Sequence, residues 1–263
     1  MLRMLAALAA LTLGTSLACA ADKPTKVRWF GQSLIQIESS TGKKIVFDPH
    51  LIPIFGNDKP EADLVCITHE HDDHNQDTIL PKNDKRIVLR GLKATNKQKT
   101  IFEWNKIDQK IEALGATVKT FGTYHDEKDG KERGLNSIFV ITVDGLTFCH
   151  LGDLGHELSP QLIKQIGKID VLLIPVGGIY TINGEVARKV TAAINPRLFA
   201  VPMHYAVEGY DDLLSNAEFL EEQKNVKKME DNNELSVSAD MKPEEGYTVA
   251  VLGFKKAEPK KDK

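Results

Sequence analysis

Short apolar runs separated by turn residues recur along the chain and predict β-strands. The first two, at 27–37 and 44–47, lie on either side of a Ser-Ser-Thr-Gly turn and are typical of a hairpin. Further runs of this kind lie at 64–67, 87–89, 118–121, 137–143, 146–151, 171–175, 198–201 and 248–254. Asp144-Gly145 joins two of these runs and favours a tight two-residue hairpin.

Apolar residues spaced three and four apart predict helices between the later strands. The clearest such series is Ile101, Trp104, Ile107, Ile111 and Leu114, with Gly115 as its stop. Ser159-Pro160 combines an N-cap with a first-turn proline and predicts a helix to about Ile166. Two more helices are expected at 185–194 and, with acidic composition, at 211–224. Strands that first run in hairpins and then alternate with helices indicate an α+β fold.

The composition is that of one globular domain. The 263 residues are 41% hydrophobic and 27% charged, which excludes collagen-like, coiled-coil and intrinsically disordered chains. No repeat or low-complexity segment interrupts 21–254, so we expect this range to form a single domain. The formal net charge is −3, whereas proteins that bind a phosphate backbone usually carry a basic excess, so we expect no nucleic-acid partner.

Both chain ends differ from the rest. Arg3, the apolar run 4–13 and the small residues of Ala18-Cys19-Ala20 together predict a signal peptide at 1–20, and therefore an exported protein, periplasmic or secreted. The apolar run is shorter than the roughly 20 residues that span a bilayer. An uncleaved anchor or a lipid tether at Cys19 are the alternatives. Residues 255–263 are charged and are expected to form a flexible tail.

Cleavage after Ala20 would leave two cysteines, Cys66 and Cys149. Each lies within an apolar run, where a small buried thiol commonly packs. An exported protein could join them in a disulfide, and the sequence alone leaves this open. We favour two free, buried thiols.

The segment that points to chemistry is Thr68-His-Glu-His-Asp-Asp-His74. It begins where the apolar strand 64–67 ends, so its polar side chains leave a buried strand at the edge of a sheet. Burying so many imidazoles and carboxylates is unfavourable unless something binds them. A solvated charged loop is the alternative, but such loops are usually rich in Lys and Glu. Imidazole and carboxylate are ligands of Zn²⁺ and related ions, so the segment predicts a metal site.

This H-x-H-x-D-H pattern resembles the signature of the metallo-β-lactamase superfamily. Further matching blocks are Tyr124-His125, Leu151-Gly-Asp153 and Pro202-Met-His-Tyr205, together with Trp29-Phe-Gly-Gln-Ser33 and Phe47-Asp-Pro49. The resemblance covers about residues 27–254 and implies an αββα four-layer sandwich. Within the superfamily, the blocks His150-Leu-Gly-Asp-Leu-Gly155, Ile174-Pro-Val-Gly-Gly178 and Val201–Tyr205 are most similar to the branch of ascorbate-6-phosphate lactonase and related uncharacterised metal-dependent hydrolases.

The resemblance implies a dinuclear metal-dependent hydrolase. One ion would be held by His69, His71 and His125, the second by Asp73, His74 and His204, and Asp153 would bridge them. The ions are expected to be Zn²⁺, with Mn²⁺ or Fe as alternatives. A metal-activated hydroxide would attack a small ester, lactone or phosphoester. The alternatives are a phosphodiesterase or nuclease of the same superfamily and a metal-binding relative without activity.

The candidate catalytic residues are Asp73 and His156, the latter as a proton shuttle from a nearby loop. His50 and His150 are expected to have structural roles, with His150 orienting a ligand. Asp48 is expected to be a buried hydrogen-bond acceptor that organises the histidine segment. Gln32 stands where many relatives have His, which puts a minor pocket contact in doubt. The 126–134 loop is expected to form a hairpin over the pocket rim.

Overall fold

The computed structural model describes residues 23–56, 59–229, 231–243 and 245–254. The predicted signal peptide and charged tail lie outside these residues, so both stay predictions. Among the described helices, none is long and apolar enough to cross a bilayer. Of the cysteines, Cys66 and Cys149 are described, and both are free and buried, as predicted.

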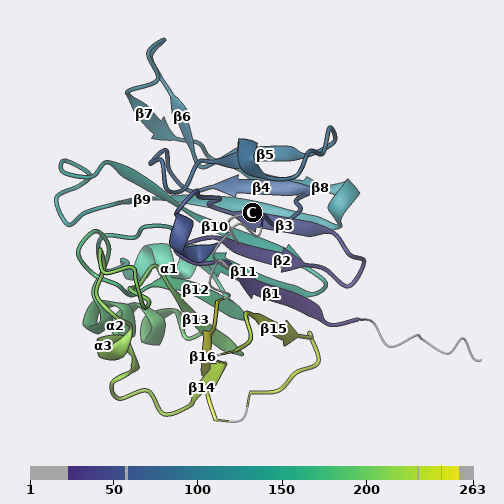
Figure 1. The fold of residues 1–263 in the computed structure, drawn as a ribbon, viewed down its shortest axis with the longest axis vertical. Coiled ribbons are helices and arrows are strands. Elements are labelled where there is room, and N and C mark those ends of the chain that lie inside the picture. Colours follow the sequence, from purple (N-terminus) through teal and green to yellow (C-terminus); the bar gives the residue numbers. More distant parts are fainter. Residues whose placement is uncertain (1–22, 57–58, 230, 244, 255–263) are drawn as a thin grey trace, which may run out of the picture.

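Two β-sheets face each other, and Figure 1 shows their strands running across the molecule. The strands of the first sheet are, in spatial order, β15 (Glu234–Val237), β1 (Thr25–Trp29), β2 (Ile35–Glu38), β3 (Lys44–Phe47), β4 (Leu64–Ile67) and β5 (Ile87–Arg90). Those of the second are β14 (Val226–Met229), β16 (Thr248–Leu252), β13 (Phe199–Met203), β12 (Val171–Pro175), β11 (Leu146–His150), β10 (Leu135–Val143), β9 (Ala116–Tyr124) and β8 (Asp108–Ile111). A separate ribbon pairs β6 (Leu92–Ala94) with β7 (Phe102–Trp104).

The period-two side-chain pattern of the strands divides the core into two layers. In β3, Ile45 and Phe47 face the second sheet, whereas Val46 faces the opposite side. β4 follows the same rule, with Cys66 toward the second sheet and Val65 away from it. Successive strand residues point to opposite faces, so a strand that is apolar throughout has to be covered on both sides.

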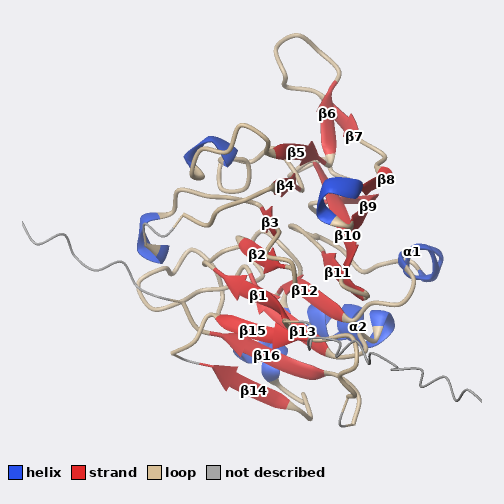
Figure 2. Cartoon of the chain, turned by 90° about the vertical axis from the view of Figure 1, so that its right-hand side faces the viewer, coloured by secondary structure: helices blue, strands red, loops and turns tan. Residues whose placement is uncertain are grey.

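Helices cover the outer face of the second sheet (Figures 1 and 2). They are α1 (Pro160–Ile166), α2 (Gly184–Ile194) and α3 (Ala217–Leu220). The predicted N-cap at Ser159 is confirmed, since its side chain accepts a hydrogen bond from the Leu162 amide, and Asn183 caps α2 in the same way. The outer face of the first sheet packs instead against the segment of a 3₁₀-helix, η2 (Asp77–Ile79). The arrangement agrees with the predicted αββα sandwich of the metallo-β-lactamase fold. Among the described residues its outer layers differ, because α-helices cover the second sheet whereas a 3₁₀-helical segment covers the first.

The single strand predicted at 27–37 is wrong, because the chain turns within it. The Leu34 amide donates to the Gly31 carbonyl oxygen at 2.9 Å, and the Phe30 amide donates to that of Leu34 at 2.9 Å. Gly31 and Gln32 both have positive φ, at 94° and 49°. The turn separates β1 from β2 and places Gln32 near the histidine segment, a point that hydrophobic spacing does not convey.

The helix predicted at 101–114 is also wrong. The segment forms β7, β8 and a 3₁₀ turn, η3 (Glu112–Leu114), which Gly115 ends in a left-handed conformation. Ile101 is 59% exposed, whereas Ile107, Ile111 and Leu114 join the core from different elements. Their three- and four-residue spacing is therefore not one face of a helix, and pairing with β6 and β9 satisfies the backbone instead.

The acidic segment 211–224 forms only the short helix α3. Strands β14 and β15 were not predicted, because their sequences, VKKM and ELSV, mix polar with apolar residues. Both lie at a sheet edge, where one side of the strand has no neighbour and charged side chains are tolerated.

Asp144, in the turn between β10 and β11, joins the two sheets. Its carboxylate accepts hydrogen bonds from the Thr25 hydroxyl at 2.7 Å and from the Ser40 amide and hydroxyl at 2.6 and 2.9 Å.

We expect Asp144→Ala to lower the free energy of unfolding by about 1–3 kcal/mol, measured by urea titration. Asp129→Ala is the matched control, since Asp129 also has positive φ (57°) but lies at an exposed loop tip. Equal losses in both variants would contradict a role for these bonds.

Candidate metal centre

Four strand ends bring the predicted ligands together. The 69–74 segment follows β4, His125 follows β9, Asp153 comes after β11, and His204 follows β13. Strands β9, β11 and β13 run in the same direction within the second sheet. Their carboxyl ends therefore meet at one edge, the usual place for a site in such sheets.

The side chains form groups whose atoms could bind a metal ion. One group consists of three imidazoles, those of His69, His71 and His125. Another combines the Asp73 carboxylate with the imidazoles of His74 and His204, and a third, with Asp48, His69 and His74, overlaps both. Within each group the ligand atoms lie within 4.8 Å of one another. These six candidate ligands therefore lie close enough together to share metal ions, and their role as ligands stays a prediction.

Asp153, the seventh predicted ligand, lies between the two groups. Its Oδ2 atom is 3.2 Å from the Nε2 atoms of His74, His125 and His204 and 3.9 Å from that of His69. Burial opposes ionisation of this carboxyl, but the nearby charges of His204 and His74 outweigh it and hold its pKa well below the usual value. The carboxylate is therefore ionised at the point where the two groups meet.

Asp48 fixes the orientation of His74. Its Oδ2 accepts a hydrogen bond from His74 Nδ1 at 3.0 Å and from the Thr68 hydroxyl at 2.7 Å, and its Oδ1 accepts one from the Thr68 amide. This confirms the predicted role of Asp48 as a buried acceptor. Because the proton of His74 lies on Nδ1 in this arrangement, Nε2 is left to face the ligand cluster.

The donor atoms fit divalent metal ions. The Nε2 atom of His74 is fully buried and makes no well-oriented hydrogen bond, although it lies 3.2 Å from Asp153 Oδ2. Burial opposes the charged form of this imidazole, but Asp153 and the other nearby carboxylates outweigh burial and raise its pKa. His69 Nε2 and His71 Nδ1 face each other at 3.1 Å, and burial lowers the pKa of both imidazoles, which favours their neutral forms. Neutral imidazoles around an ionised carboxylate are the donor set that Zn²⁺ and similar ions prefer.

Gln32, at which the resemblance put a minor pocket contact in doubt, lies directly against the candidate ligands. Gln32 is 1% exposed, and its side-chain amide donates a hydrogen bond to Asp73 Oδ2 at 3.0 Å. Its backbone carbonyl oxygen accepts a hydrogen bond from the backbone amide of His204 at 3.0 Å. Its Oε1 atom is buried without a hydrogen-bond partner. Gln32 therefore contacts two members of the second ligand group, and only the turn at 30–34 brings it there.

The remaining histidines bond to backbone atoms. His50 Nε2 bonds to the Gly31 carbonyl oxygen, and burial lowers the pKa of this imidazole to about 4. His150 is fully buried, stacks on Phe47 and accepts from the Gly152 amide next to Asp153, which agrees with its predicted structural role. His156 accepts from the Tyr124 amide at 3.1 Å and donates to the Glu157 carbonyl oxygen at 2.7 Å. With both ring nitrogens engaged, His156 has no free nitrogen for the predicted proton shuttle.

A hollow of about 390 Å³ opens over the ligands. Besides five of the ligands, its lining includes Glu132, Arg133 and Tyr180. The first two come from the 126–134 loop, whose predicted place at the rim is confirmed. Asp126 folds this loop by accepting hydrogen bonds from the amides of Lys128, Gly130, Glu132 and Arg133. The Arg133 guanidinium lies 5.7 Å from the centre of the Tyr180 ring and faces this hollow as a cation.

We expect Gln32→Leu to weaken metal binding by the group that contains Asp73, because it removes the hydrogen bond to Asp73. Loss of such a partner costs roughly 10- to 100-fold in affinity. Titration of metal-free protein with Zn²⁺ against a chelator would measure the affinity. Gln36→Leu is the control, since Gln36 is also buried but bonds to Arg28 and Glu61. Unchanged Zn²⁺ affinity in Gln32→Leu would refute this role.

The chain is similar in sequence and fold to known proteins. Residues 26–204 match the beta-lactamase superfamily domain. A UPF0173 metal-dependent hydrolase of Thermococcus onnurineus is 33% identical over 196 residues, 68% of this chain and 84% of that protein. One from Bacillus velezensis is 30% identical over 199 residues, 68% of this chain and 85% of that protein. A crystal structure of a metallo-beta-lactamase superfamily protein from Thermotoga maritima has a TM-score of 0.64 at 31% identity and covers 88% of this chain and 100% of that one. The chain therefore belongs to the metallo-β-lactamase superfamily, in the family that contains these UPF0173 metal-dependent hydrolases.

Proposed function

We propose that this protein is a dinuclear metal-dependent hydrolase of small esters, lactones or phosphoesters. The observation that carries the proposal is the placement of Asp153 Oδ2 between two separate groups of three ligands. Divalent ions held there would polarise the substrate and lower the pKa of a water molecule toward about 7. Zn²⁺ suits the imidazole-rich first group, and Mn²⁺ or Fe are the alternatives.

In this proposal the two groups have different tasks. His69, His71 and His125 would hold one ion with nitrogen ligands alone, which leaves its positive charge uncompensated by that group. Asp73, His74 and His204 would hold the second, and Asp153 would be shared. Burial and the nearby Asp153 carboxylate both act to raise the pKa of Asp73, but the hydrogen bond and charge of His74 outweigh them and hold this pKa below its usual value. A bound cation would further relieve the repulsion between the two carboxylates.

Asp73 is the proposed catalytic carboxylate. Its side chain is 40% exposed, whereas that of Asp153 is 3% exposed, so of these two carboxylates Asp73 is the one that a substrate can approach. Gln32 fixes one of its oxygens by a hydrogen bond. An ionised carboxylate in this position can accept a proton from an attacking water molecule. Arg133, at the rim, can hold a polar oxygen of the substrate.

The central test is metal analysis of the purified protein combined with His71→Ala. We expect about two ions per chain in the wild-type protein, and one or fewer in the variant together with loss of turnover, because the variant removes one of three ligands from the first group. Inductively coupled plasma mass spectrometry gives the metal content, and p-nitrophenyl esters report turnover. Normal metal content and activity in His71→Ala would refute the ligand assignment.

His156→Gln separates the predicted proton shuttle from the metal chemistry. Since both ring nitrogens of His156 bond to the backbone, we expect the variant to keep its metal and at least about half of kcat. A loss of kcat by about 100-fold, the lower range for general acid–base catalysis, with full metal content would restore the shuttle.

A further inference from the structure

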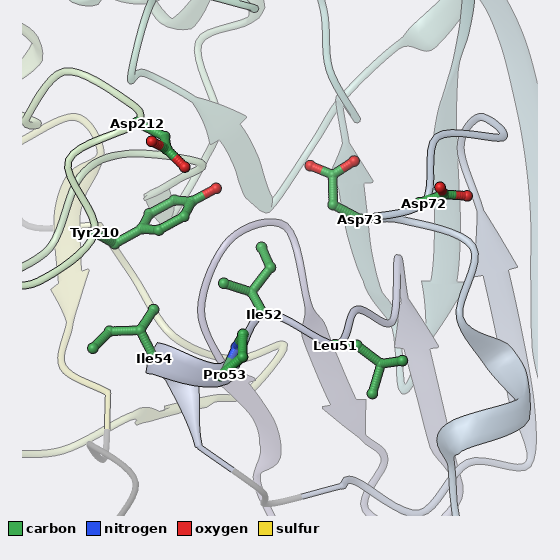
Figure 3. Close-up of a pocket in the computed structure, with 8 residues that line it drawn as sticks. All are labelled: Leu51, Ile52, Pro53, Ile54, Asp72, Asp73, Tyr210 and Asp212. Carbon is green, nitrogen blue, oxygen red and sulfur yellow. The ribbon is translucent and has the colours of Figure 1, made fainter.

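A second hollow, of about 880 Å³, adjoins the metal centre and shares Asp73 with it (Figure 3). The segment 51–54 forms its apolar floor, and Tyr210 stands opposite Asp73. Asp72 and Asp212 complete the lining. Ile52 and the Tyr210 hydroxyl point into the space beside the Asp73 carboxylate.

The floor of this hollow is held by buried contacts. His50 Nδ1 accepts from the Ile52 amide at 3.1 Å, while its Nε2 bonds to the Gly31 carbonyl oxygen at 3.1 Å. Phe55 follows the floor segment in the chain. The centre of its ring lies 5.4 Å from that of Tyr210 and 6.2 Å from that of Trp29. Because both walls rest on the core, the hollow is present before any substrate binds.

The charged groups that line the hollow disfavour an anion there. Three carboxylates line it, and none of the lining residues among those the structure describes is Lys, Arg or His. Burial, with the negative charges of Asp73 and Asp212, raises the pKa of Tyr210 to about 12, so its hydroxyl stays neutral at physiological pH. Leu51 is 54% exposed and adds apolar surface.

We propose that this hollow is a subsite for an uncharged apolar group, the alkyl or aryl part of an ester or lactone substrate. The proposal rests on the hydrolase function proposed above and narrows it: phosphorylated and other anionic substrates are disfavoured on this side of Asp73. Polar oxygens of the substrate would bind in the hollow over the ligands, where Arg133 supplies a positive charge. The preferred substrate therefore has an apolar part on one side of Asp73 and polar oxygens on the other.

Hydroxamates test the subsite without turnover, because their head group binds metal ions while the tail varies. We expect Zn²⁺-loaded protein to bind hexanohydroxamate at least about tenfold more tightly than acetohydroxamate, measured by calorimetry. A fully buried methylene contributes roughly fourfold in affinity, and partial burial of the longer tail in an open hollow reduces the total. Equal affinities of the two probes would overturn the proposal.

Two pairs of variants locate the effect. Ile52→Asp should reduce the preference for hexanohydroxamate to less than about threefold, whereas Ile101→Asp, at an exposed position that does not line the hollow, should keep it. Asp212→Lys should strengthen binding of succinic monohydroxamate several-fold, and Asp211→Lys, beside it but outside the lining, should not. A preference for the succinic probe in the wild-type protein would also overturn the proposal.

The same proteins with p-nitrophenyl acetate and hexanoate separate the two proposals. Tail-dependent hydroxamate binding without hydrolysis of either ester would support the subsite and refute the hydrolase. Hydrolysis with equal kcat/KM for both esters, unaffected by Ile52→Asp, would leave the hydrolase in place and refute the subsite.

Discussion

The structure depends on one buried carboxylate oxygen that four imidazoles surround. Asp153 Oδ2 lies within 3.9 Å of His69, His74, His125 and His204. Such an arrangement is stable only if the negative charge is compensated by protons or by metal ions. The loops that carry these residues begin at four different strands, so these atoms meet only if both sheets keep their register.

Close backbone contacts make this convergence feasible. A Cβ atom on Gly155 would lie 2.2 Å from the Asp126 amide nitrogen, and one on Gly177 would lie 2.2 Å from the His204 carbonyl oxygen. Glycine at these two places allows the loops of neighbouring strands to approach one another. The Gly177 and Gly178 amides are used in this packing, where they donate to His204 and Ile182. Asp48 adds a second level of support, since it binds both the start and the end of the histidine segment.

The candidate ligands could be named from the sequence because their blocks resemble those of a known superfamily. Each block follows an apolar run that forms a strand, which explains why the structure brings these residues to one edge. The spacing of apolar residues gave a wrong prediction at 101–114, where strand pairing and core contacts determine the structure. Ile101, Ile107 and Leu114 have helical spacing, yet they lie in a loop, another loop and a 3₁₀ turn. The role of Gln32 could not be predicted, because it requires a turn with positive φ inside an apparently continuous strand. The hollow at 51–54 lies between Asp73 and Tyr210, which are far apart in sequence, and only the fold brings its walls together.

Each ligand group takes members from both sheets: the 69–74 segment follows the first, whereas His125 and His204 follow the second. An ion bound by either group would thus act as a cross-link between the two halves of the sandwich. Occupancy and folding would then be thermodynamically linked, so that the apoprotein separates its sheets more easily than the loaded form. Scarcity of the ion would reduce the lifetime of the protein as well as its turnover.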